Sequence, residues 1–167
     1  MRKYLLTFAA LAALGGAVVA SQLSGRLSAA PDAAAVDASA LPSYAPQKAV
    51  YQFTHKGGWF GGEYTRVLNI MQNHVAALGP GRLDLRVVLS GEGLLLLKDA
   101  RTSTQLSGMV DKLRQQGVRF LICNNTVVAK HLDPARDLYD VAPGDIVRAG
   151  IAEVASLQQQ GFVYLNP

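Results

Sequence analysis

Between residues 48 and 167, strand-like apolar runs alternate with stretches that have helical spacing, and this alternation constrains the fold most strongly. Five segments have strand character: residues 49–54, 83–89, 118–122, 145–147 and 162–165. Two of them end in the unbroken apolar runs VVL and FLI, which is typical of strands buried on both faces. Strands that alternate with helices predict βαβ crossovers. We therefore expect an α/β fold: a single three-layer domain with a mostly parallel five-stranded sheet and helices on both faces.

The intervening stretches have the spacing of amphipathic helices. The clearest is the apolar series Tyr64, Leu68, Met71, Val75 and Leu78, whose members recur at steps of four and three. The sequence GPG at 79–81 ends this helix. Further helices are expected near 106–113, 124–131 and 151–158, and the apolar run 94–97 is too short to classify.

The first 20 residues have the pattern of a secretory signal peptide. Arg2 and Lys3 precede an uncharged apolar run of 16 residues, and Val18-Val19-Ala20 suits cleavage before Ser21. The run is shorter than the roughly 20 residues that span a bilayer. We expect export to the periplasm; the alternative is a membrane anchor formed by an uncleaved signal. Residues 21–47, rich in Ala, Ser and Pro, read as a flexible linker to a domain at 48–167.

Charge and cysteine content restrict the function classes. Without Arg2 and Lys3, 14 of the 16 basic residues remain against 12 acidic ones, a net charge of +2. This balance argues against a nucleic-acid partner. The three histidines and the one cysteine lack HxxxH or CxxC spacing, so we expect no metal and no cofactor.

Polar groups follow three of the predicted strands. His55 follows the first, Ser90-Gly91-Glu92 the second, and Cys123-Asn124-Asn125 the third. Ligands of open α/β sheets bind beyond the carboxyl ends of the strands. If the three strands are neighbours, these groups share one edge of the sheet and form a candidate site.

Cys123 is the most informative of these residues. A single cysteine has no internal disulfide partner, so its thiol is free, reactive or intermolecular. At the start of a helix, backbone N–H groups favour the thiolate; the alternative is a buried, inert side chain. His55 either bonds the thiol and carries protons or is an exposed strand-end histidine. The run Asn124-Asn125-Thr126 either binds a ligand or caps the helix.

The glycine-rich loop at 56–62 leaves two interpretations open. Its backbone N–H groups suit an anion, although it lacks the GxxxxGK[ST] and GxGxxG patterns. Alternatively, Trp59 and Phe60 are exposed and pack on a neighbouring subunit.

The segment GVRFLICNNT at 117–126 resembles the Gly-Val-x-Phe-x-x-Cys-x-Asn-Thr segment of exported DsrE/DsrF-like proteins. VAPG at 141–144, Glu153, LQ at 157–158, GFVY at 161–164 and Pro167 extend the resemblance over residues 48–167. It implies a largely parallel five-stranded sheet and a homo-oligomer, often a trimer or hexamer. In sulfur-relay members, a cysteine after the third strand carries sulfur as a persulfide to a partner protein, and Cys123 matches that position.

Two functional hypotheses follow. In the first, Cys123 carries a persulfide, while His55, Ser90 and Asn124 position the sulfur, and a donor or acceptor protein is the partner. In the second, the protein is a non-catalytic oligomeric module that binds a small ligand or a partner, and Cys123 is structural.

Overall fold

The computed structural model describes residue 37 and residues 41–167, and residues 41–167 form one compact unit. The predicted signal peptide, residues 1–20, and most of the predicted linker, residues 21–47, lie outside the described residues. None of the helices within the described part is long and apolar enough to cross a membrane.

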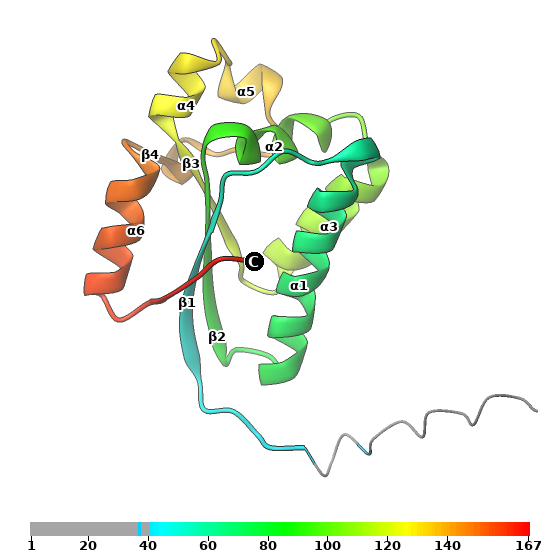
Figure 1. The fold of residues 1–167 in the computed structure, drawn as a ribbon, viewed down its shortest axis with the longest axis vertical. Helices are drawn as coiled ribbons and strands as arrows, with labels where there is room; N and C mark the ends of the chain where they lie inside the picture. The colour runs from blue at the N-terminus through cyan, green and yellow to red at the C-terminus, as the bar shows by residue number, and fades with distance from the viewer. Residues whose placement is uncertain (1–36, 38–40) are drawn as a thin grey trace, which may run out of the picture. The chain divides into compact units, whose positions relative to one another are not determined.

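A five-stranded sheet forms the centre of the domain (Figure 1). Its strands are β1 (Gln47–Phe53), β2 (Leu83–Leu89), β3 (Arg119–Cys123), β4 (Ile146–Val147) and β5 (Val163–Leu165). Their order is β4-β3-β2-β1-β5, and all four pairings are parallel. The expected α/β fold is confirmed, and β1, β2 and β3 are direct neighbours.

Strand β1 begins at Gln47, one residue before the predicted start of the domain. The Gln47 N–H donates to the carbonyl of Arg82 at 2.9 Å, and Gln47 pairs with Leu83 of β2. The Gln47 side-chain carbonyl also accepts a hydrogen bond from Nε2 of His74 at 2.9 Å. These contacts come from distant parts of the chain, so the local composition at residue 47 does not indicate them.

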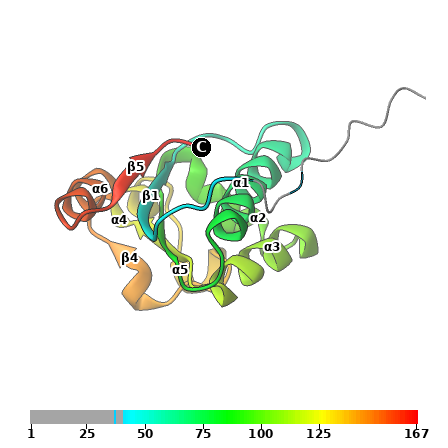
Figure 2. The same cartoon turned by 90° about the horizontal axis from the view of Figure 1, so that it is seen from below.

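Helices cover both faces of the sheet, as Figure 2 shows. On one face lie α1 (Gly62–Leu78), α2 (Leu95–Asp99) and α3 (Thr104–Gln115); α6 (Gly150–Gln159) lies on the other. Two short helices, α4 (Asn124–Ala129) and α5 (Pro134–Asp137), follow the carboxyl end of β3 (Figure 1). The expected single helix at 124–131 is thus shorter, and Asp133 caps α5 by accepting from the N–H groups of Ala135 and Arg136.

The core has two parts because side chains alternate along each strand. The larger cluster packs against α1–α3 and includes Phe53, Leu89 and Ile122. The smaller cluster packs under α6 and consists of Val50, Val88, Leu121, Val154, Leu157 and Phe162. Odd-numbered positions of β2 therefore face α1–α3, whereas its even-numbered positions face α6.

The turn after β2 is held tightly against β1. The apolar run that the sequence left unclassified continues a 3-10 helix, η3 (Gly91–Leu94), into α2. A Cβ at Gly93 would lie 2.2 Å from the carbonyl oxygen of Phe53, so only glycine fits there. The Tyr64 hydroxyl donates to the carbonyl of Glu92 at 3.1 Å. Together these contacts fix the position of Ser90 and Gly91 at the edge of the sheet.

Candidate functional site

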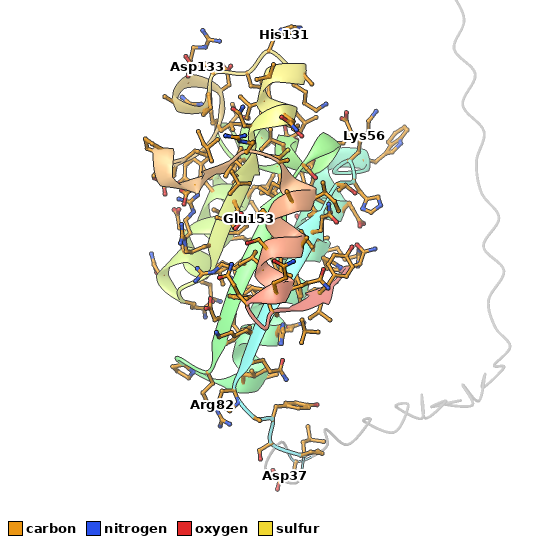
Figure 3. All side chains as sticks on the ribbon, turned by 90° about the vertical axis from the view of Figure 1, so that its left-hand side faces the viewer. Asp37, Lys56, Arg82, His131, Asp133 and Glu153 are labelled. Carbon is orange, nitrogen blue, oxygen red and sulfur yellow. The ribbon has the colours of Figure 1, made fainter. Side chains whose placement is uncertain are left out.

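The carboxyl ends of β1, β2 and β3 meet at one edge of the sheet because the strands are adjacent and parallel. Of the predicted groups, His55 and Ser90 follow the ends of β1 and β2, and Cys123 is the last residue of β3. Lys56 and His131 mark this end of the domain in Figure 3, and Arg82 marks the opposite end.

Cys123 is the last residue of β3 and directly precedes α4. Its side chain is buried, with 5% exposed, and it forms no disulfide. The N–H of Gly150, at the start of α6, donates to Sγ at 3.2 Å. Burial alone raises the pKa of the Cys123 thiol, but donation from the N–H of Gly150, the hydroxyl and N–H of Thr126 and the N–H of Asn125 outweighs it. The pKa therefore lies below the ordinary value of 9.0, and the site favours the thiolate.

Thr126 connects the turn after β2 to the thiol. Its Oγ1 accepts a hydrogen bond from the N–H of Gly91 at 3.0 Å, and its hydroxyl helps to lower the pKa of the Cys123 thiol. Gly91 has a φ of 53°, a conformation that side chains rarely adopt. The backbone of Gly91 thus orients the hydroxyl that stabilises the thiolate.

Gly150 allows α6 to approach the strand ends closely. A Cβ there would lie 3.2 Å from Cγ1 of Val88, 3.3 Å from Cβ of Ser90 and 3.4 Å from Cβ of Cys123. The half-buried Ser90 and the buried Cys123 therefore lie side by side beneath Gly150. The structure thus brings together two of the residues named from the sequence.

An ion pair joins η3 to the end of α4, close in sequence to Ser90 and Thr126. Nζ of Lys130 lies 2.5 Å from Oε1 of Glu92. The hydrogen bond from Lys130 lowers the pKa of the Glu92 carboxyl, burial opposes it, and the charges of Lys130 and Lys56 add to the lowering. The turn that supplies the Gly91 N–H is thereby attached to the helix that carries Thr126.

The structure places His55 apart from the thiol. His55 is exposed, its ring centroid lies 6.2 Å from that of Phe53, and no hydrogen bond within residues 41–167 joins it to Cys123. Phe53 belongs to the core cluster under α1–α3, whereas Cys123 contacts α6 on the opposite face. The alternation of side chains along parallel strands accounts for this separation.

The two asparagines play different parts. The side chains of both Asn124 and Asn125 are exposed, but the backbone N–H of Asn125 donates to the sulfur. Neither side chain caps α4: the residue at the cap position is Cys123, which makes no side-chain capping bond. The capping interpretation is therefore wrong, because the helix begins immediately at Asn124.

Thr126 and Gly150 are the site residues that sequence reasoning missed. The sequence indicates Thr126 only as part of a run that binds a ligand or caps the helix, and it predicts the last helix near 151–158, one residue after Gly150. A glycine between a predicted strand and a helix is the one signal that indicated a close backbone approach. Within the described residues, no group of three or more His, Cys, Asp or Glu side chains is arranged to hold a metal ion.

The sequence model of the DsrE/DsrF-like family matches residues 50–167. The chain belongs to the DsrE/DsrF-like family. The matched region runs from within β1 to the last residue. It includes Cys123 and the residues around it: Ser90, Gly91, Thr126 and Gly150. The DsrE/DsrF-like domain is also similar to the solved structure of MTH1491, a protein of unknown function from Methanobacterium thermoautotrophicum. Sequence identity is 27%, the TM-score is 0.61, and the similarity covers 72% of this chain and 99% of MTH1491. No curated protein matches the chain.

Proposed function

We propose that this DsrE/DsrF-like protein handles sulfur and that Cys123 is its persulfide-carrying thiol. The observation that carries the proposal is the hydrogen bond from the N–H of Gly150 to Sγ at 3.2 Å; hydrogen bonds from Thr126 and Asn125 also lower the pKa of the same thiol. A buried apolar cysteine needs none of these donors, whereas a thiolate nucleophile needs them to offset its desolvation.

The proposed step is a thiol exchange without net oxidation. The Cys123 thiolate attacks the terminal sulfane sulfur of a polysulfide, forming a Cys–S–S bond as the donor S–S bond breaks. The electron pair of the broken bond leaves with the shortened polysulfide. The persulfide anion that remains on Cys123 keeps the negative charge, so the same donors stabilise it.

The enclosure of Cys123 favours a small donor. Only 5% of the residue is exposed, and Gly150 and Ser90 lie against its side chain. A linear inorganic polysulfide is narrow enough to approach such a sulfur at the edge of the sheet. Ser90, beside Cys123, is positioned to interact with the added sulfur.

The proposal also covers the partner protein, the oligomeric state and the location of the protein. A sulfur donor or acceptor protein exchanges with Cys123, the protein acts as a homo-oligomer such as a trimer or hexamer, and the signal at residues 1–20 directs it to the periplasm. The family match supports the sulfur chemistry in general terms. Export rests on the sequence pattern of residues 1–20 alone.

The burial of Cys123 also favours a second candidate, an oligomeric binding module in which the thiol is structural. The two candidates differ in the reactivity of the native thiol. We expect a small disulfide reagent to modify the folded protein at neutral pH, and Cys123→Ser to show no modification. Modification that begins only after unfolding in urea would instead support the structural role.

A further inference from the structure

A charged cavity lies on the α6 face of the sheet, outside the Cys123 site. Its volume is about 310 Å³, at the small end of the range for ligand pockets. Residues of β1, β2, β3, β4 and α6 line it, together with Gly144, Gln160 and Phe162. Five charged side chains line it: Lys48, Asp84, Arg86, Arg119 and Glu153. Glu153 is labelled on α6 in Figure 3.

Three cations come from three adjacent strands. Arg86 of β2 and Arg119 of β3 are direct partners in the sheet register, and Lys48 lies on the same face of β1, two residues before the partner of Arg86. Arg86 pairs with Asp84 at 3.0 Å, and Arg119 lies 3.8 Å from Asp145. Lys48 forms no ion pair with any described residue, and its ammonium lies 5.6 Å from the centroid of the Phe162 ring. The cavity therefore holds a cation without an acidic partner.

The second charged group of interest in this cavity is the carboxylate of Glu153 on α6. The side chain is half-buried and lines the same cavity, yet it forms no ion pair or hydrogen bond with the part of the chain described here. One cavity thus exposes an unpaired positive group on β1 and an unpaired negative group on α6.

Apolar side chains form part of the remaining wall, together with Gly144 and Gln160. Phe162 is buried and both Lys48 and Arg86 lie over its ring, the latter at 5.8 Å. Leu121 and Leu157 complete this surface. Such a wall suits a ligand that carries a short apolar group together with one positive and one negative group.

We propose that this cavity binds a small zwitterion of the amino-acid class. Lys48 and Arg86 receive its carboxylate, Glu153 receives its ammonium group, and Phe162 packs against its side chain. A phosphate or other dianion fits less well, because the carboxylates of Asp84 and Glu153 also line the cavity. A neutral apolar ligand would leave both unpaired charges desolvated. The proposal is independent of the sulfur chemistry, since Cys123 does not line this cavity.

Calorimetric titration of the full chain with L-methionine tests the proposal. Methionine supplies both charges and an apolar side chain. Its deaminated analogue, 4-(methylthio)butanoate, lacks the ammonium group, and 3-(methylthio)propylamine lacks the carboxylate. We expect methionine to bind and each analogue to bind about tenfold more weakly, since one charged hydrogen bond is lost in each.

Two variants test which protein side chain binds the ammonium group of the ligand and which binds its carboxylate. Glu153→Gln weakens methionine binding about tenfold but leaves the deaminated analogue unaffected, whereas Lys48→Gln weakens both. The matched controls Lys112→Gln and Asp99→Asn, at exposed positions on α3 and α2, leave methionine binding unchanged. Three results would overturn the proposal: no heat from methionine up to about 10 mM, equal affinity for both analogues and methionine, or tighter binding of inorganic phosphate.

Discussion

The backbone N–H of Gly150 donates to Sγ of Cys123 across 3.2 Å, although the two residues are 27 positions apart in the chain. This hydrogen bond joins the start of α6 to the end of β3. The packing of a core helix and the ionisation of the thiol are therefore linked: the contact that seats α6 also favours the thiolate.

Thr126→Val is expected to slow the reaction of Cys123 at neutral pH by about tenfold, because one donor to the thiolate is lost. It also leaves the N–H of Gly91 without its acceptor, which costs about 1–3 kcal/mol of the free energy of unfolding. The rate of alkylation by a small haloacetamide measures the first effect, and urea denaturation measures the second.

The control is Thr126→Ser, which keeps the hydroxyl and is expected to react at the wild-type rate. A Thr126→Val protein that reacts as fast as the wild type would show that the hydroxyl does not stabilise the thiolate.

Gly150→Ala is expected to lower the free energy of unfolding by about 1–3 kcal/mol, because the new methyl group overpacks against Val88, Ser90 and Cys123. Displacement of α6 also lengthens the N–H to Sγ hydrogen bond, so the pKa of Cys123 should rise. Urea denaturation and the thiolate absorbance as a function of pH report the two effects.

Gly108→Ala provides the matched comparison on α3, where a Cβ meets nothing within 4 Å. A gain of about 0.5–1 kcal/mol is expected there, since alanine is the better helix former. Equal effects of the two substitutions would mean that Gly150 does not form a close contact.

The stability of the domain should fall as the pH drops below 6.5, and His74 should account for part of the fall. Burial lowers the pKa of His74, which accepts from the Tyr51 hydroxyl at Nδ1 and donates to Gln47 from Nε2. Below 6.5 the unfolded chain binds a proton at this residue before the folded chain does. Unfolding then takes up a proton, so stability declines until the lower folded pKa is reached.

Urea denaturation at a series of pH values measures this dependence in the wild type and in His74→Gln. The variant should show a shallower decline below pH 6.5, whereas His55→Gln, at an exposed position, should match the wild type. Identical declines in stability for His74→Gln and the wild type would show that His74 does not contribute to the pH dependence.

The sequence predicts the strands of this domain well because its signals are local. Alternation and apolar runs locate β2 at Leu83–Leu89, and the predicted third strand is shifted by only one residue. The position of Cys123 and Ser90 at one edge follows from strand ends in a parallel sheet.

The rest of the site depends on contacts that no local pattern encodes. Thr126 approaches Gly91 across 35 positions, and Gly150 approaches Cys123 only after α6 has packed on the sheet. His55 follows the correct strand but lies by Phe53, on the face away from α6. The positions of the strands are predictable here to a useful degree, whereas the side-chain face beyond a strand end is not.

The most direct test of the central claim is the intact mass of the protein, purified without reductant, before and after incubation with inorganic polysulfide. The account predicts a gain of one sulfur atom that dithiothreitol removes and that Cys123→Ser does not show. An unchanged mass in the wild type, or the same gain in Cys123→Ser, would contradict the assignment of Cys123 as the sulfur carrier.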